Sequence, residues 1–414
     1  MARLWSSGAE LNSTAANVEF TSNAGTVSIV TSPVRSGTYA VRSNPTASFG
    51  NVKYAYRAAA TQESVFIRFY LRIGTLPSAS TNWIFDTTGV GTKMILRMTS
   101  GGALQLYNAE DSAQVGSNSS ALSVDTWYRI EVGIDTTTLA STVTSARIDG
   151  VEFASGTVNL GGAINSLTFG INQAGVTADL YYDDMAINDS TGSFQNSYPG
   201  AGEIIHLRPN AAGDNNQWDT DLASGDANNY QRVDEVTPDD VTSYIASATL
   251  DQIDDYNIDA TPAALASDDT INVVQVGVRF AVADATSTDP DFVLRIKASA
   301  SGTVEESAAI DASSTSWRTN AISSPSNYKL TLYDLPGAST TAWTKSTLDT
   351  TQIGVRQAAA DAHEAWISTL WLLVEHKPAD GGGGSGRTAA SSRATASSRS
   401  GAASRSTASS RTVV

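Results

Sequence analysis

Two adjacent acidic residues, Asp183 and Asp184, have side chains that could take part in hydrolytic chemistry. Most glycosidases use two carboxylates that face one substrate across a short gap. Asp183 and Asp184 are neighbours in a strand-like phrase, and neighbours on a strand point to opposite faces. A second strand-like phrase carries Glu131, which stands alone between Ile130 and Val132. Neither arrangement fits a mechanism with two carboxylates.

Other catalytic signatures are missing from the sequence, which has no G-x-S-x-G, no H-E-x-x-H and no phosphate-binding glycine loop. Cysteine is absent, which excludes disulfides and thiolate metal sites. The three histidines (His206, His363 and His376) would all have to converge to form a metal cluster. A lyase-type base beside an arginine or asparagine stays open, because it could come from distant parts of the chain. We expect a protein that is not an enzyme.

An acidic stretch spans residues 214–269, where 14 acids accompany one base, Arg232. Cation binding is one interpretation of this stretch. The Asp219-Thr220-Asp221 phrase, however, lacks the third acid and the glycine of an EF-hand loop, since Ala223 and Ser224 stand there. A solvated rim of loops is the interpretation that the sequence favours.

A basic tail ends the chain behind four glycines at 381–384. Its arginines recur every six residues among small polar ones: Arg387, Arg393, Arg399, Arg405 and Arg411. In an extended strand or a polyproline II helix they would line one side. The net charge is −16, and the tail carries +5 without any acid, so the rest carries −21. Two interpretations of the tail stay open: it docks onto an acidic protein surface, or it is a solvated extension. The acidic charge of the rest of the chain argues against nucleic acid as its partner.

The stretch 122–150 predicts the centre of a β-sandwich. Tyr128, Ile130, Val132 and Ile134 alternate with polar or small residues, which is typical of a strand with one buried face. The Asp-Gly pair at 149–150 lies between alternating runs and predicts a tight hairpin.

Similar short alternating runs recur along the rest of the chain. We predict an all-β fold of two consecutive antiparallel β-sandwich (jelly-roll) domains, at residues 1–200 and 201–380, followed by the low-complexity tail at 381–414. The run 366–374 is almost continuously apolar, so we expect a strand that is covered on both faces.

Four phrases occur in an order that resembles the concanavalin A-like lectin/glucanase (laminin-G-like) jelly roll: SGTY at 36–39, DTWYRIE at 125–131, IDG at 148–150 and YDDM at 182–185. The phrases SFQNSYPG at 193–200 and RPNAAGDN at 208–215 are similar to a junction in virion proteins of tailed bacteriophages. These resemblances cover about half of the chain and specify a fold better than an activity.

The jelly-roll resemblance implies two kinds of site. In related carbohydrate-binding domains an acid on the last strand holds a structural calcium, which here would be Asp183 or Asp184 near the turn at 36–38; a carboxylate that caps a loop is the alternative. Sugar binding would need exposed aromatic side chains, and the sequence offers Trp83, Tyr107, Trp127 and Tyr181, each of which could instead belong to the core.

We therefore expect a non-enzymatic structural component of a bacteriophage virion, from the tail, a fibre or the head surface. Its partners would be other virion proteins, further copies of itself and host-surface glycans. A secreted carbohydrate-binding adhesin and a polysaccharide-degrading enzyme are the alternatives. The first residues lack an apolar signal segment, and no run reaches the roughly 18 apolar residues of a membrane helix, which fits a protein made in the host cytoplasm and released in the virion.

Overall fold

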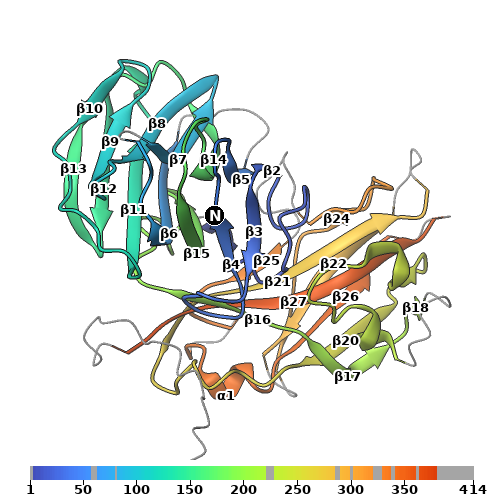
Figure 1. Ribbon diagram of the computed structural model, residues 1–414. Coiled ribbons are helices and arrows are strands. Elements are labelled where there is room, and N and C mark those ends of the chain that lie inside the picture. The colour runs from blue at the N-terminus through green and yellow to red at the C-terminus, as the bar shows by residue number, and fades with distance from the viewer. Residues whose placement is uncertain are drawn as a thin grey trace, which may run out of the picture. The chain divides into compact units, whose positions relative to one another are not determined.

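Antiparallel β-structure accounts for nearly all regular elements of this protein. The computed structural model describes residues 3–56, 63–79, 82–220, 228–284, 290–298, 302–319, 329–336, 341–359 and 363–379. Within these residues the strands form four antiparallel sheets (Figure 1). Helical elements in the same ranges are α1 (Lys345–Leu348) and the short 3₁₀ turns η1 (Leu139–Ser141), η2 (Asn229–Arg232) and η3 (Asp240–Thr242). The predicted all-β class is confirmed.

Two large sheets form the first sandwich. The β6 sheet has the order β13 (Val151–Val158), β12 (Thr142–Ile148), β11 (Trp127–Asp135), β6 (Ser64–Thr75), β15 (Asp179–Asp189), β4 (Ala40–Ser43) and β3 (Val27–Val30), with β1 (Arg3–Ser7) paired to β15. The β14 sheet has the order β10 (Ala113–Val115), β9 (Leu104–Asn108), β8 (Gly91–Met98), β7 (Asn82–Gly89), β14 (Ile164–Ile171), β5 (Gly50–Ala55) and β2 (Ser22–Gly25). One apolar core fills the space between them, with Trp5, Phe69 and Phe169 among its large side chains.

Two further sheets form the second sandwich. The β27 sheet has the order β18 (Asp219–Thr220), β19 (Ile245–Ser247), β27 (Ala365–Lys377), β21 (Thr270–Val282) and β25 (Lys329–Leu332), with β16 (Glu203–Leu207) paired to β27. The β26 sheet has the order β17 (Pro209–Asn216), β20 (Ile253–Ile258), β26 (Gln352–Gln357), β22 (Asp291–Lys297) and β23 (Val304–Glu306), with β24 (Ile310–Asp311) paired to β22. A second core lies between them and includes Phe280, Phe292 and Leu370. The sandwich architecture expected from the sequence is confirmed for both halves of the chain.

The alternation along β11 is seen in the structure as predicted. Ile130, Val132 and Ile134 are buried in the first core, and Tyr128 packs against it. The Asp149–Gly150 pair joins β12 to β13 with positive φ angles of 52° and 87°, which are those of a tight hairpin turn. The predicted polar face of β11 differs from expectation, because Glu131 is also buried.

The chain between β15 and β16 covers that second face of β11. Glu131 accepts a hydrogen bond from the Gly200 amide (2.8 Å), and Tyr198 packs against Phe66 with ring centroids 5.1 Å apart. A side chain at Gly133 would lie 2.2 Å from the Tyr198 hydroxyl, so only glycine permits this contact. The phrase at 193–200 is therefore held against the β6 sheet.

The long strand β27 is covered on both faces, as its apolar run predicts. Ile367, Leu370, Leu372 and Val374 point into the second core. Trp371 and Leu373 pack on the other side, with Leu11, Val18 and Ile204. The tail prediction cannot be compared with the structure in this way, because residues 380–414, with all five tail arginines, lie outside the described residues.

Candidate functional site

The outer face of the β27 sheet, on the side away from the second core, carries two groups of side chains that could have a function. Along β27 this face presents Trp366, Trp371, Leu373 and Glu375, since the alternate side chains belong to the core. Residues near the chain's start cover the half of the face around Trp371 and Glu375. The half around Trp366 carries a separate group of aromatic side chains.

Glu375 is the centre of a buried ionic network that joins the two sandwiches. Its carboxylate accepts two hydrogen bonds from Arg3 (2.5 and 3.2 Å) and two from Arg68 (3.2 and 3.0 Å). All three side chains have 0% exposure. Burial alone would raise the pKa of Glu375, but the two guanidinium groups outweigh it and lower this pKa to about 2.

Further hydrogen bonds engage other N–H groups of the two guanidinium groups. Arg3 also donates to Asn188 (2.6 Å), and Arg68 donates to the Asp184 carbonyl oxygen (2.9 Å). A side chain at Gly202 would lie 2.5 Å from an Arg68 nitrogen and 3.0 Å from the Glu375 carboxylate. Glycine at 202 is therefore what allows the backbone to cross directly over this ion pair.

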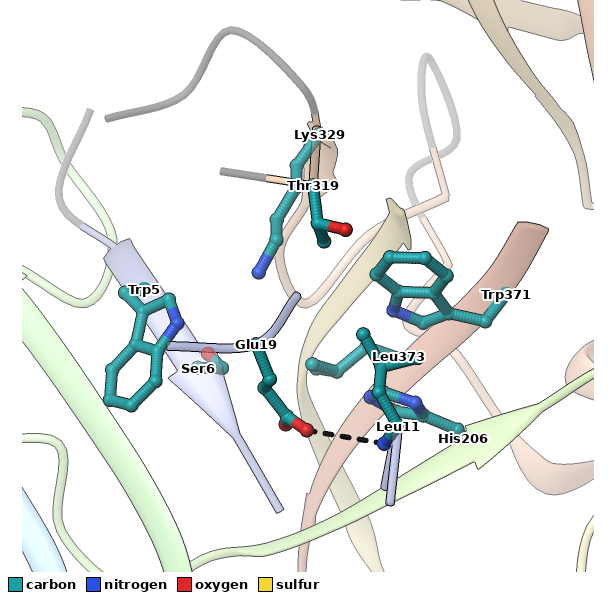
Figure 2. Close-up of a pocket in the computed structure, with 9 residues that line it drawn as sticks. All are labelled: Trp5, Ser6, Leu11, Glu19, His206, Thr319, Lys329, Trp371 and Leu373. Carbon is teal, nitrogen blue, oxygen red and sulfur yellow. Dashed lines mark hydrogen bonds between the residues drawn. The ribbon is translucent and has the colours of Figure 1, made fainter. Parts of the chain in front are cut away.

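A small cavity, whose lining residues are drawn in Figure 2, lies next to Ser6, and the Ser6 hydroxyl accepts a hydrogen bond from Arg3 of the network. It has a volume of about 10 Å³, close to the least that can hold one water molecule. Its walls come from β1, β16, β25 and β27, from the loop after β1 and from Thr319 beside the Arg318 bridge. The lining residues are Trp5, Ser6, Leu11, Glu19, His206, Thr319, Lys329, Trp371 and Leu373. Such a space is too small for a substrate.

The ionisable groups of the cavity are shifted towards their neutral forms. Burial raises the pKa of Glu19, although hydrogen bonds from Ser7 and from the Leu11 amide (3.1 Å) oppose this rise. Burial lowers the pKa of Lys329 to about 8, against the attraction of Glu19, towards which its amine points in Figure 2. His206 has a strongly lowered pKa for the same reason and stacks on Trp371, with centroids 5.6 Å apart.

Asp183 and Asp184 lie on the same side of β15, contrary to the expectation from simple alternation. The register with β6 shifts between Asp183 and Ala186, and Asp184 has a positive φ of 47°. This β-bulge turns both carboxylates towards the loop at Arg35 and Ser36. The two remain buried, and burial followed by the charge of Asp184 raises the pKa of Asp183 well above its usual value.

Every oxygen of this acidic pair accepts a hydrogen bond. Asp183 accepts from the backbone amides of Arg35 (2.8 Å) and Asp184 (2.8 Å). Asp184 accepts from the Ser36 hydroxyl (2.6 Å), the Ile204 amide (2.7 Å) and the guanidinium of Arg35. The Arg35 guanidinium is paired with Asp184, so the arrangement fits the alternative of carboxylates that cap a loop. Among the described residues no cluster of three or more His, Cys, Asp or Glu side chains is placed to hold a metal; the calcium hypothesis stays a prediction for experiment.

The acidic stretch at 214–269 is partly internal, which corrects the expectation of a solvated rim. Asp254 is fully buried and accepts hydrogen bonds from Asn229 (2.6 Å) and Tyr256 (2.7 Å). Asp255 pairs with Arg295 at 3.1 Å. These carboxylates organise the β26 sheet and its loops because buried donors need acceptors.

The four aromatic residues proposed from the sequence lie in the first sandwich and do not form one surface. The Arg97 guanidinium covers the Tyr107 ring at 3.2 Å, and Tyr181 is buried. Trp83 and Trp127 are half-buried. Trp127 and Tyr181 are both paired in register with Arg72 on β6, so these two lie on one face of the β6 sheet, whereas Trp83 and Tyr107 belong to the β14 sheet.

Sequence reasoning missed an aromatic cluster on the second sandwich, which consists of Tyr244, Trp317 and Trp366. The ring of Trp366 lies 4.7 Å from that of Tyr244 and 6.4 Å from that of Trp317, and the other two are 6.2 Å apart. All three side chains are half-buried. They come from three segments that are far apart in the chain, so the only sequence signal is tryptophan and tyrosine next to polar residues.

No protein-family model and no curated protein matches this sequence. The first sandwich has two large, facing antiparallel sheets, which is the architecture that the resemblance to the concanavalin A-like jelly roll predicts. Solved structures resemble part of the chain. The endo-β-1,4-glucuronan lyase of the fungus Trichoderma reesei is 15% identical, with a TM-score of 0.35, over 46% of this chain and 100% of its own.

Two further structures contain bound sugars. Domain 4 of AbnA, a GH43 extracellular arabinanase from Geobacillus stearothermophilus in complex with arabinotriose, is 13% identical with a TM-score of 0.32, over 45% of this chain and 93% of its own. The ligand-binding domain of botulinum neurotoxin serotype D, in complex with N-acetylneuraminic acid, is 14% identical with a TM-score of 0.31, over 41% of this chain and 43% of its own. These scores are too low to argue for a function. The phage origin stays a prediction.

Proposed function

We propose that this protein is a non-enzymatic structural and attachment protein of an extracellular assembly, in which the two sandwiches act as a single rigid element. The observation that carries the proposal is the buried network of Arg3, Arg68 and Glu375. Domains joined by a small polar interface usually move relative to each other. Here any sliding would separate Glu375 from its two partners and leave charges buried without compensation, which is strongly unfavourable.

Two further observations support a structural role over catalysis. The space beside the network holds about 10 Å³, far below the roughly 300–1,000 Å³ of typical ligand pockets. The larger hollow of about 320 Å³ beside β10 and β13 has one ionisable lining residue, Asp111, which cannot by itself supply a mechanism with two carboxylates. The buried acidic pair, Asp183 and Asp184, already accepts hydrogen bonds from Arg35, Ser36 and Ile204. These carboxylates are thus engaged in holding a loop. No helix among the described residues is long and apolar enough to cross a membrane.

A tailed-phage virion is the setting that we propose for this element. The resemblance of the phrases at 193–200 and 208–215 to a phage junction supports it. In the structure the first phrase is packed on the β6 sheet through Tyr198, and Arg208 at the start of the second donates to the Glu10 carbonyl oxygen (3.0 Å). A rigid junction of this kind suits a protein that bears load on a particle surface.

The test is to purify particles from a lysate of the producing culture and quantify the chain by mass spectrometry. We expect it to co-purify with particles at a fixed ratio to the major capsid protein. Recovery of the chain only in the particle-free fraction would contradict the virion setting. In parallel, the chain is incubated with neutral and uronate polysaccharides, and new reducing ends and unsaturated products are measured. Product formation above that of heat-inactivated protein would contradict the non-enzymatic role.

A further inference from the structure

The aromatic cluster of Tyr244, Trp317 and Trp366 lies on the outer face of the β27 sheet. Trp366 is paired in register with Ala246 on β19 and with Ala281 on β21. Directly paired residues of antiparallel strands point to the same face, so two alanines flank the indole. Because alanine side chains are small, the rings of Tyr244 and Trp317 can occupy the space on either side of Trp366.

The neighbouring segments place these rings by the same alternation. Ile245 belongs to the second core, so Tyr244 and Ala246 on either side of it face outward. Arg318 exchanges two backbone hydrogen bonds with Phe280 (3.0 and 2.8 Å), which sets Trp317 beside Ala281. Three separate segments thus converge on one spot of the sheet.

Among the residues that the structure describes, the first sandwich covers this face up to Arg279. The Arg279 guanidinium donates to the Asn17 carbonyl oxygen (2.7 Å) and pairs with Asp240 at 2.6 and 2.8 Å. The aromatic cluster lies one row beyond this contact, where β21 continues to Ala281. The rings are half-buried, so part of their surface faces solvent.

Polar groups border the rings. The Trp366 indole donates to the exposed carboxylate of Glu364 (3.1 Å), and the Asp240 carboxylate, 29% exposed, lies next to Arg279. Aromatic faces bind the C–H faces of sugar rings, and carboxylates accept hydrogen bonds from sugar hydroxyls. An apolar centre with a few convergent polar groups is the usual composition of a small-ligand site.

The size and charge of the aromatic cluster indicate which kind of ligand it would bind. The three ring centroids lie 4.7, 6.2 and 6.4 Å apart, so the rings pack on one another and their exposed parts form one compact apolar patch, suited to a small ligand. A stable protein interface needs about 800 Å² on each partner, more than half-buried rings of this number can offer. The exposed carboxylate of Glu364 beside Trp366 and a body charged −21 without the tail repel uronates, sialic acid and nucleic acid.

We propose that the cluster of Tyr244, Trp317 and Trp366 is a binding site for one neutral hexopyranose unit of a surface glycan. The inference does not depend on the virion setting, since a site of this kind would serve any attachment protein. It gives a location to the glycan contact that the sequence suggested, on the second sandwich instead of the first.

The test uses the full chain on an array of neutral and acidic glycans, followed by titration of the best neutral oligosaccharide with tryptophan fluorescence as the readout. Trp366→Ala and Trp317→Ala should each weaken binding about fivefold or more, since an aromatic contact of this kind contributes about 1 kcal/mol or more. Trp366→Phe, which keeps a ring, should restore part of the affinity. Trp127→Ala removes a half-buried tryptophan of the first sandwich and should bind as the wild type does.

Thermal melting of each variant separates a lost site from a lost fold, and Trp366→Phe keeps the test informative if an alanine variant unfolds. Several outcomes would overturn the proposal: no neutral glycan bound by the wild type, acidic glycans bound as tightly as neutral ones, or unchanged affinity in both cluster variants. Loss of binding in Trp127→Ala alone would place the glycan site on the first sandwich. The co-purification experiment tests the virion setting alone, so its outcome does not depend on whether this cluster binds a glycan.

Discussion

Replacing Glu375 by glutamine removes the charge at the centre of the inter-sandwich network and keeps the shape of the side chain. Arg3 and Arg68 then remain buried, each with 0% side-chain exposure, without a counter-charge. Breaking a buried ion pair on one side costs about 3–5 kcal/mol. The pKa gives a second value, because a fall from 4.5 to about 2 corresponds to about 3 kcal/mol of stabilisation in the ionised form.

The assay is urea unfolding followed by circular dichroism and intrinsic fluorescence. Glu306→Gln is the matched control, because Glu306 also bridges two arginines, Arg295 (2.5 Å) and Arg356 (2.7 Å), but is 29% exposed. We expect a loss of about 3–5 kcal/mol for Glu375→Gln and about 0–1 kcal/mol for the control. Equal losses in the two variants would refute the reasoning that burial of the network is what joins the sandwiches.

The pH dependence gives an independent check of the same network. The folded-state pKa of Glu375 is below its usual value, so its stabilisation is fully present above about pH 4.5 and is lost as the pH falls towards about 2. The difference in unfolding free energy between wild type and Glu375→Gln should shrink over this window. A difference that stays constant would contradict the assigned ion pairs.

Four further predictions follow from the same structure. Burial raises the pKa of Glu10 to about 8, so the unfolding free energy of the wild type should fall by roughly 4–5 kcal/mol as the pH rises from about 4.5 through about 8. In urea titrations at several pH values, Glu10→Gln should lack this contribution to the pH dependence. An equal pH dependence in the two proteins would contradict the raised pKa of Glu10. Ile130→Asp buries a charge in the first core at a cost of several kcal/mol and should abolish the cooperative melt, whereas an unchanged melt would mean that the buried face of β11 is misassigned. A chelator should leave the melting temperature unchanged if Arg35 is the partner of Asp184 and backbone amides are the partners of Asp183; a fall that added calcium reverses would support a calcium site instead. Deletion of residues 381–414 should leave melting unchanged but reduce incorporation into particles, as added salt should also do; equal occupancy would identify the tail as a solvated extension.

Local chemistry determined much of the fold. The alternation of Ile130, Val132 and Ile134 identified the buried face of β11, and the Asp-Gly pair at 149–150 identified its hairpin, because both signals depend only on residues close in sequence. The apolar run at 366–374 likewise indicated a strand covered on both sides. Each of these features is confirmed in the structure.

Tertiary structure decided what the polar side chains do. Glu375 lies 372 residues from Arg3 and 307 from Arg68 in sequence, so no local pattern pairs them. Asp183 and Asp184 were expected on opposite faces, and the β-bulge at Asp184 brings them to one side. A bulge inserts one residue into a regular period, and the partner strand that imposes it is invisible in the sequence.

The candidate glycan site shows the same division most clearly. Tyr244, Trp317 and Trp366 are unremarkable in the sequence, where each could belong to a core. Their convergence depends on the pairing of β19, β27 and β21 and on the bridge from Arg318 to Phe280. Strand formation depends on local alternation, which the sequence displays directly. The meeting of side chains from distant strands depends on sheet order and register, which are fixed only when both sandwiches have buried their cores.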